Sequence, residues 1–164
     1  MTSTGASDSA ILDILISRGA LAPATKRTIQ LFASKWSCSH FSALIESSVI
    51  SEGELADALA LMVQIPRLHG ISSQHISPEV LGLLSYSTAR EFEAIPVANF
   101  EDTGKVEVAV ANPADENRVN ALRKMFSGEI VLAVGERSDI VSAIDEMYPL
   151  KNRWPSVWDC VKSK

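Results

Sequence analysis

Three consecutive residues, Asp102-Thr103-Gly104, match the triplet that carries the catalytic aspartate of aspartic proteases. That chemistry needs two carboxylates that share one proton. The chain holds one copy of the triplet, followed by Lys105, so a protease would have to be a homodimer whose second copy supplies the other aspartate. The same three residue types are typical of a tight hairpin turn. We therefore expect a turn at this position rather than a proteolytic site.

A zinc site is the second chemistry that the residue types allow. The candidate ligands are Cys38, His40, His69 and His75. Structural zinc sites usually show two close pairs of ligands at regular spacing, and these four residues do not follow such a pattern. We expect a buried cysteine with exposed or capping histidines, and no bound metal.

Motifs for an activated nucleophile or for phosphate binding are missing from the sequence. There is no Gly-x-Ser-x-Gly, no Gly-x-x-x-x-Gly-Lys-Ser/Thr loop and no Gly-x-Gly-x-x-Gly. A helix expected to open at Asn112-Pro113 has free backbone N–H groups, but Asp115 and Glu116 occupy that positive end and would repel a phosphate. We expect no catalytic residues and no cofactor.

Composition narrows the class of protein further. The 164 residues are 46% hydrophobic, enough for one domain or two small ones, and no apolar run approaches the ~20 residues of a membrane helix. The net charge is −5 and the 15 basic residues are scattered, which argues against a general nucleic-acid or anionic-membrane surface. Cys38 and Cys160 lie far apart, as in a reducing compartment, and residues 1–8 do not resemble a secretory signal. We expect a soluble cytoplasmic protein that does not insert directly into a membrane.

Helical periodicity dominates up to a break at residues 66–77. Two apolar stripes are spaced as on helices, one formed by Ile11, Leu12, Leu15 and Ile16 and the other by Ile29, Phe32, Ala33 and Trp36. Gly19 provides the stop between them, and a third helix is expected over residues 38–47. Ser51 and Glu54 match a capping box that opens a fourth helix. Residues 1–65 are therefore predicted to form a small helical subdomain.

After the break the pattern alternates between helices and strands. The expected order is a helix over 78–84, a helix over 87–93, strands over 95–99 and 105–111, a helix over 112–126, a strand over 129–134 and a helix over 136–147. The first two strands, joined by residues 101–104, should form an antiparallel hairpin. A strand, helix, strand order normally gives a parallel pair. The prediction for residues 66–149 is an α/β subdomain with a small mixed sheet of about three strands covered by helices, and the whole fold is α+β.

The tail, residues 150–164, carries an amphipathic pattern. Trp154, Val157, Trp158 and Val161 recur at helical spacing, with Pro155 near the start of the expected helix. These residues either dock back onto this domain or contact a following domain or a partner, where tryptophan is frequent at hot spots.

Several short motifs occur in one order along the chain. They are Ser51-Glu-Gly-Glu-Leu55, Ala58-Leu59, Ile65-Pro66, Ile76-Ser-Pro-Glu-Val80, Ile95-Pro96-Val97 and Val108-Ala-Val-Ala-Asn112-Pro113. Together they resemble the N-terminal domain of type II secretion and type IV pilus assembly ATPases, the GspE N-terminal-like domain, over residues 11–148. The resemblance implies a domain that tethers an ATPase to an inner-membrane assembly protein, and in some members one that binds cyclic di-GMP.

The nucleotide-binding motifs of that family resemble Arg-Leu-Gly, a short helix, Gly and then Leu-x-x-Ala-Leu. The second Leu-x-x-Ala-Leu is intact at Leu55 to Leu59, and Gly19 fits the first turn. Other positions depart from the pattern: Ala10-Ile11-Leu12 and Ser39-His40-Phe41 replace Arg-Leu-Gly, and Ser48 replaces the second glycine. The guanidinium that would pair with phosphate is lost. Cyclic di-GMP binding is therefore an alternative and not the expected function.

A second resemblance is to the cytoplasmic N-terminal region of certain bacterial membrane glycosyltransferases, and it rests on Ala43-Leu44-Ile45-Glu46, residues 49–54 and Ala58-Leu59-Ala60. The function we expect is a non-enzymatic interaction or regulatory module. Its partner would be a protein, the cytoplasmic part of an inner-membrane component of a secretion, pilus or glycosyltransferase system. The alternatives are a cyclic di-GMP sensor, the regulatory front of a glycosyltransferase and, as an enzyme, a dimeric aspartic protease.

Overall fold

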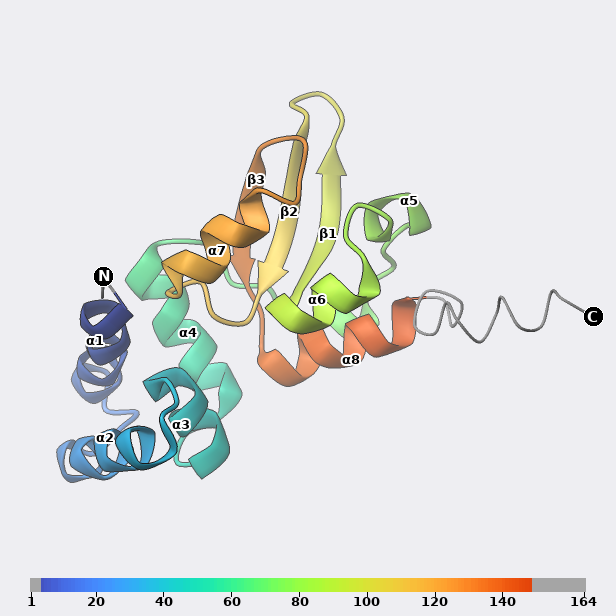
Figure 1. Ribbon diagram of the computed structural model, residues 1–164. Coiled ribbons are helices and arrows are strands. Elements are labelled where there is room, and N and C mark those ends of the chain that lie inside the picture. Colours follow the sequence, from blue (N-terminus) through green and yellow to red (C-terminus); the bar gives the residue numbers. More distant parts are fainter. Residues whose placement is uncertain (1–3, 149–164) are drawn as a thin grey trace, which may run out of the picture.

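Helices gather at one end of the protein and a mixed sheet with further helices forms the other end, as the computed structural model shows (Figure 1). The structure describes residues 4–148. The elements are α1 (Thr4–Ser17), α2 (Pro23–Trp36), α3 (His40–Ser47), α4 (Glu52–Val63), η1 (Ile71–Ser73), α5 (Pro78–Leu81), α6 (Tyr86–Phe92), β1 (Ala94–Phe100), β2 (Lys105–Val110), α7 (Glu116–Arg123), β3 (Ile130–Val134) and α8 (Arg137–Met147). The predicted α+β class with N-terminal helices is confirmed.

The helical half, α1 to α4, is held by the apolar stripes that the sequence indicated. α3 packs against α1 and α2, and α4 packs against α1. The side chains that meet there are fully buried, among them Leu12, Leu15, Leu44 and Leu59. The capping box predicted at Ser51 and Glu54 is present at the start of α4. These contacts fix α4, which forms one wall of the pocket described below.

Two details of this half differ from the expectation. The third helix begins at His40 and not at Cys38, because the Ser39 side chain accepts from the Ser42 N–H and so caps it. Trp36 was predicted in an apolar stripe with Ile29 and Ala33; those two are buried, but Trp36 is 64% exposed. It is the last residue of α2, after which the chain turns away at Ser37.

The sheet has the order β1-β2-β3 among the described strands. β1 and β2 form the predicted antiparallel hairpin, with Ile95 opposite Ala109, and β2 and β3 form the predicted parallel pair, with Val108 opposite Leu132. Successive strand residues point to opposite faces. Both Val108 and Ala109 are fully buried, so this part of the sheet is covered on both faces. β1 contains Pro96, and a bulge follows between Pro96 and Ala98.

The helix after β2 starts later than predicted. Asn112 was expected to cap it, but the Asn112 side chain instead accepts from the Ala114 N–H and closes a turn. Asp115 is the actual N-cap, accepting from the Arg118 N–H, so α7 runs from Glu116 to Arg123 rather than to Phe126. Asn112-Pro113 thus marks the exit from the strand, because an asparagine side chain that bonds two residues ahead favours a turn.

Residues 66–68, at the start of the break that the sequence indicated, connect the helical half to the sheet. Leu68 donates its N–H to the Val134 carbonyl at 2.8 Å, and Val134 donates to the Pro66 carbonyl at 2.8 Å. Residues 66–68 therefore run parallel to the end of β3, with Arg67 as the bridging residue. None of the helices between residues 4 and 148 has the length and apolar character that crossing a bilayer requires.

Candidate functional site

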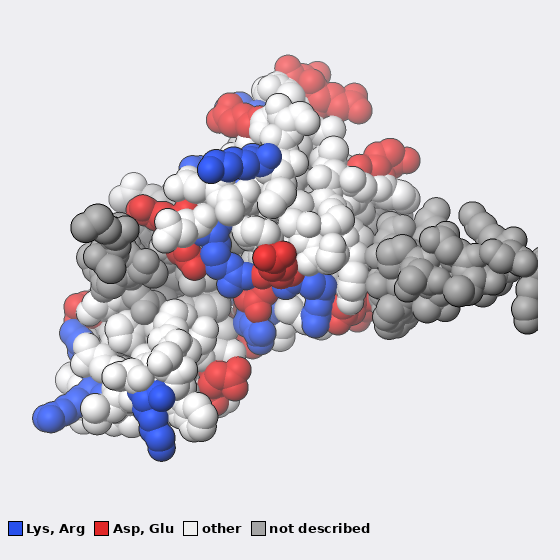
Figure 2. Space-filling model, in the orientation of Figure 1, with Lys and Arg blue, Asp and Glu red and all other residues white. Residues whose placement is uncertain are grey.

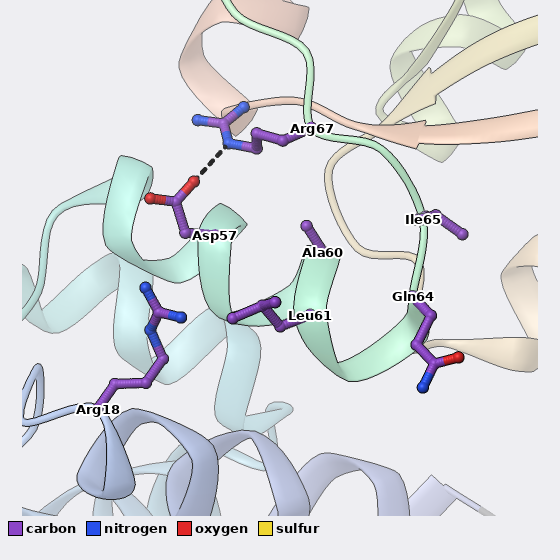
Figure 3. A pocket seen from close by; sticks show the side chains of 7 residues that line it. All are labelled: Arg18, Asp57, Ala60, Leu61, Gln64, Ile65 and Arg67. Carbon is purple, nitrogen blue, oxygen red and sulfur yellow. Dashed lines mark hydrogen bonds and ion pairs between the residues drawn. The ribbon is translucent and has the colours of Figure 1, made fainter.

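A surface pocket of about 600 Å³ opens between the end of α1 and the outer face of α4. Figure 3 shows the seven residues that line it: Arg18, Asp57, Ala60, Leu61, Gln64, Ile65 and Arg67. Pockets of this volume are in the range that takes small molecules. Leu61 is 59% exposed, so the pocket is an open depression on the surface rather than an enclosed cavity.

The period of α4 places four of these residues on one face. Asp57, Ala60, Leu61 and Gln64 are spaced as i, i+3, i+4 and i+7. The opposite face, with Leu55, Ala58 and Leu59, is buried against the helical half. Gln64 ends the helix in the left-handed conformation at φ 58°, which turns the chain toward β3 and brings Arg67 back beside Asp57.

Arg67 is the most connected side chain of the pocket. Its Nε donates to Asp57 Oδ1 at 3.1 Å and its Nη2 donates to Glu136 Oε1 at 2.7 Å. Its Nη1 donates to the backbone carbonyls of Leu68 and Val134. The Arg67 side chain is only 11% exposed, whereas the two carboxylates are half-buried. The planar guanidinium thus ties α4 to the segment between β3 and α8, which a single-point ammonium could not do.

Glu136 belongs to a run of four residues at the start of α8, Glu136 to Asp139, which we call the α8 hub. Each residue of the hub bonds to a different segment. Arg137 Nε donates to Glu93 Oε1 at 2.7 Å, after α6, and the Ser138 N–H donates to Glu52 Oε2 at 2.7 Å, in the first turn of α4. The hub therefore joins the helical half to α6 and to the 66–68 segment at one place.

Asp139 completes the hub by capping η1. Its two carboxylate oxygens accept from the backbone N–H groups of Ile71 and Ser72, at 2.6 and 3.0 Å, and from the Ser72 hydroxyl. Burial acts to raise the pKa of this carboxyl, but the bonds from Ser72 and Ile71 and the charge of Arg67 outweigh it and lower the pKa. Asp139 is consequently held ionised by its partners.

Two further cavities lie beside the hub and the α3–α4 turn. One, of about 110 Å³, is lined by polar residues of both halves, including Glu46, Glu93, Arg118 and Arg137; it is too small for a nucleotide. The other, of about 480 Å³, lies at Ser48 and carries the carboxylates of Glu52 and Glu54. Two carboxylates would repel a phosphate. In the pocket of about 600 Å³, by contrast, Asp57 is paired with Arg67 and Arg18 has no ion pair with a described residue, so of these pockets it is best suited to an anion.

The structure scatters the residues that the sequence singled out for chemistry. Asp102 lies exposed in the turn between β1 and β2, where Gly104 takes φ 66° and donates to the Phe100 carbonyl. Cys38 is half-buried and free, and His69 and His75 are exposed. Within residues 4–148, no three His, Cys, Asp or Glu side chains gather so as to hold a metal ion. Trp154, Val157, Trp158 and Val161 lie outside the described residues.

The structure places some positions of the nucleotide-binding motifs in the core and others beside the pocket. Ile11 and Leu12, at the first Arg-Leu-Gly position, are buried in α1, while Gly19 turns the chain at φ 73° beside Arg18 of the pocket. Ser48 replaces a glycine yet adopts φ 50°, so the turn itself is kept.

The Arg67 contacts and the α8 hub were missed by the sequence analysis, because charged residues far apart in sequence carry no local signal of their pairing.

Three comparisons with known proteins point to the same family. The family model of the MshEN domain matches residues 64–153, more than half of the chain. A curated relative, the type II secretion system protein E of Xanthomonas campestris pv. campestris, is 30% identical over 104 residues, which are 61% of this chain and 18% of that protein. The chain thus matches less than a fifth of that relative's length.

Solved structures show the same fold. The structure of MshE with cdg, that is cyclic di-GMP, aligns with a TM-score of 0.71 at 21% identity, over 84% of this chain and 98% of that one. The N-terminal domain of XpsE aligns with a TM-score of 0.75 at 22% identity, over 90% of this chain and all of that one. A second crystal form of that XpsE domain gives 0.57 at 23% identity over the same shares.

Proposed function

The chain belongs to the MshEN domain family, and from this premise we propose that it is a non-enzymatic docking and regulatory domain. Its partner in this proposal is the cytoplasmic part of an inner-membrane component of a secretion, pilus or glycosyltransferase system. The secretion branch has the most support, because the 30% identical relative is a type II secretion protein E. The work of the domain would then take place at the cytoplasmic side of the inner membrane.

The observation that carries the proposal is the α8 hub. Glu136, Arg137 and Asp139 are each engaged by charged or backbone groups of another segment. Groups committed in this way hold segments in a defined orientation, whereas a catalytic acid or base must face a substrate. A domain built so is suited to presenting a rigid surface to another protein.

Binding to the cytoplasmic fragment of the inner-membrane assembly protein from the same organism tests the proposal. We expect saturable binding in titration calorimetry and no ATP hydrolysis by the chain alone. Arg67→Ala, which unties α4 from the hub, should weaken binding, and Arg90→Ala, which removes an exposed pair with Asp145, should not. Absence of binding by the folded wild-type chain would overturn the docking function.

A second candidate function, cyclic di-GMP sensing, is favoured by one feature of the pocket. Arg18 extends from the end of α1 toward the side of α4 that carries Asp57, and it has no ion pair with a described residue (Figure 3). A free guanidinium in a pocket of about 600 Å³ offers a contact for a phosphate. Heat that saturates at micromolar cyclic di-GMP and disappears in Arg18→Ala would support this function; no heat with wild-type protein would remove it.

A further inference from the structure

The outward face of α2 differs in charge from the rest of the protein. α2 carries Lys26, Arg27 and Lys35 and no acidic residue, in a chain whose net charge is −5. Its inward face is formed by Ile29 and Ala33, which are buried. Arg27, Leu31 and Lys35 follow one another at intervals of four residues and therefore lie along one line of the helix. We call Arg27, Leu31, Lys35 and Trp36 the α2 patch.

The apolar members of the α2 patch are held in place although they face solvent. Leu31 is 62% exposed and Trp36 is 64% exposed. The Trp36 ring lies 6.2 Å from the Phe32 ring, and Phe32 packs against the core. The Trp36 ring has a second contact, with Lys35, whose Nζ lies 5.6 Å from the ring centre. The indole is thus positioned before any ligand arrives, which reduces the entropy lost on binding.

The charges of the α2 patch are available for an external ligand. Lys26 pairs with Asp13, but Arg27 and Lys35 make no ion pair with a residue in the described part of the chain. Figure 2 shows blue side chains projecting at the corner where α2 lies in Figure 1, with white atoms between them. Charge is screened over roughly 10 Å at 0.1 M salt, so this corner acts as a basic surface despite the overall negative charge.

The shape and chemistry of the patch indicate what covers it. α2 is at the outer end of the helical half, away from the sheet, so its outward face is a projecting corner (Figure 1). Arg27, Leu31 and Lys35 lie along the outward line of the helix, and Trp36 is exposed at its C-terminal end, beside Lys35. A projecting helix that exposes tryptophan, leucine and basic side chains has the composition of helices that rest in the headgroup layer of a bilayer. The tail cannot supply the opposite charge, because residues 149–164 hold four basic residues and one acidic residue.

We propose that the α2 patch binds the surface of an anionic lipid bilayer, with Arg27 and Lys35 on lipid phosphates and Leu31 and Trp36 among the headgroups. The contact is peripheral and reversible. It requires no protein partner, so it stands independently of the docking function proposed above. It gives the domain a preferred orientation, with the helical half toward the membrane and the sheet away from it.

Cosedimentation of the full chain with vesicles tests the proposal. The probes are vesicles of phosphatidylglycerol and phosphatidylethanolamine, and vesicles of phosphatidylcholine as the neutral comparison. We expect binding to the anionic vesicles that weakens with added salt, and a loss of at least tenfold in affinity for the Arg27→Gln, Lys35→Gln double variant. The matched control is Arg123→Gln, Lys124→Gln at the exposed end of α7, which removes the same charge elsewhere and should bind as wild type.

Tryptophan fluorescence identifies the part of the chain that touches the lipid. In a Trp154→Phe, Trp158→Phe variant, Trp36 is the remaining one of the three tryptophans. Its emission should shift to the blue on anionic vesicles and stay unchanged on neutral ones. The proposal is overturned if wild-type protein ignores anionic vesicles, if the α7 control loses binding equally, or if Trp36 emission does not move. It is also overturned if the α2 variant loses capture of an acidic protein partner while vesicle binding is absent.

Discussion

Arg67 Nη2 lies 2.7 Å from Glu136 Oε1 although the two residues are 69 positions apart in the sequence. The same guanidinium bonds Asp57 on α4, so one side chain spans the helical half and the α8 hub. The arginine is nearly buried and its two acceptors are half-buried. The pair is therefore partly desolvated, and its loss should lower the free energy of unfolding more than the loss of a surface pair.

Replacement of Arg67 by alanine should lower the free energy of unfolding by about 2 kcal/mol, because hydrogen bonds to charged groups contribute roughly 1.5–3 kcal/mol. Lysine at this position should restore part of the loss, since it keeps the charge but not the fork. Urea unfolding monitored by circular dichroism measures both variants. Arg90→Ala is the matched control: its pair with Asp145 is exposed on both sides, and its loss should cost under ~1 kcal/mol. Equal losses for Arg67→Ala and Arg90→Ala would contradict the role given to Arg67.

Asp139 should make the free energy of unfolding depend on pH in the acidic range. Its pKa is lowered in the folded state by the bonds from Ser72 and Ile71 and by Arg67, against the opposing effect of burial. A depressed carboxyl pKa stabilises the fold above the unfolded value of about 3.9, and this contribution is lost as the pH falls through the folded value. Asp139→Asn should therefore be about 1–2 kcal/mol less stable than wild type at pH 7. The gap between the two proteins should begin to close below about pH 4 and go on closing as the pH falls through the lower folded pKa. A constant gap from pH 7 down through that range would show that the carboxylate charge is not involved.

Gly135, between β3 and α8, has no room for a side chain. A Cβ there would lie 2.5 Å from Ile71 Cδ1 and 2.9 Å from two atoms of Ile140. Both isoleucines are fully buried and have little freedom to move. We expect Gly135→Ala to cost about 1–3 kcal/mol in thermal or chemical unfolding. Gly53→Ala serves as the comparison, because its Cβ would lie no closer than 3.4 Å to any neighbour, the nearest atom being Glu136 Oε1. Alanine also favours a helix, so this variant should be neutral or slightly stabilising.

The capping box of α4 can be tested through both its members. Ser51→Ala removes the side chain that accepts from the Glu54 N–H at 3.2 Å, and should destabilise the protein by about 1 kcal/mol. The bonds from Ser51 also lower the pKa of the Glu54 carboxyl, so that pKa should rise in the variant, as a proton NMR titration can follow. Ser34→Ala on the exposed face of α2 is the control and should leave both quantities unchanged.

The elements with strong local signals could be predicted from the sequence. The capping box at Ser51, the turn at Gly104 and the antiparallel and parallel strand pairs are all found in the structure. Each depends on residues close together in the chain or on a general rule of chain connection. The start of α7 was wrong because Asn112 and Asp115 are both good capping residues, and only the backbone geometry distinguishes the turn from the helix.

The candidate site could not be predicted in the same way. Arg67 stood in a stretch that the sequence indicated only as a break, and its acceptors lie on α4 and beside α8. Asp139 caps η1, which starts 68 residues before it. Such pairings follow from the completed fold, since any arginine and any carboxylate are chemically able to pair. The exposed position of Trp36 is likewise set by where α2 ends, and helical spacing alone placed it with the core.

Pro96 and the bulge in β1 make this edge of the sheet a poor template for joining another molecule. β1 is the outer strand of the described sheet on its side, and Pro96, just before the bulge, has no N–H to offer to an added strand. A regular row of free donors and acceptors is what allows sheets of neighbouring molecules to join and aggregate. Copies of this domain at high local concentration are thereby less prone to join through their β1 edges, so that they stay separate molecules.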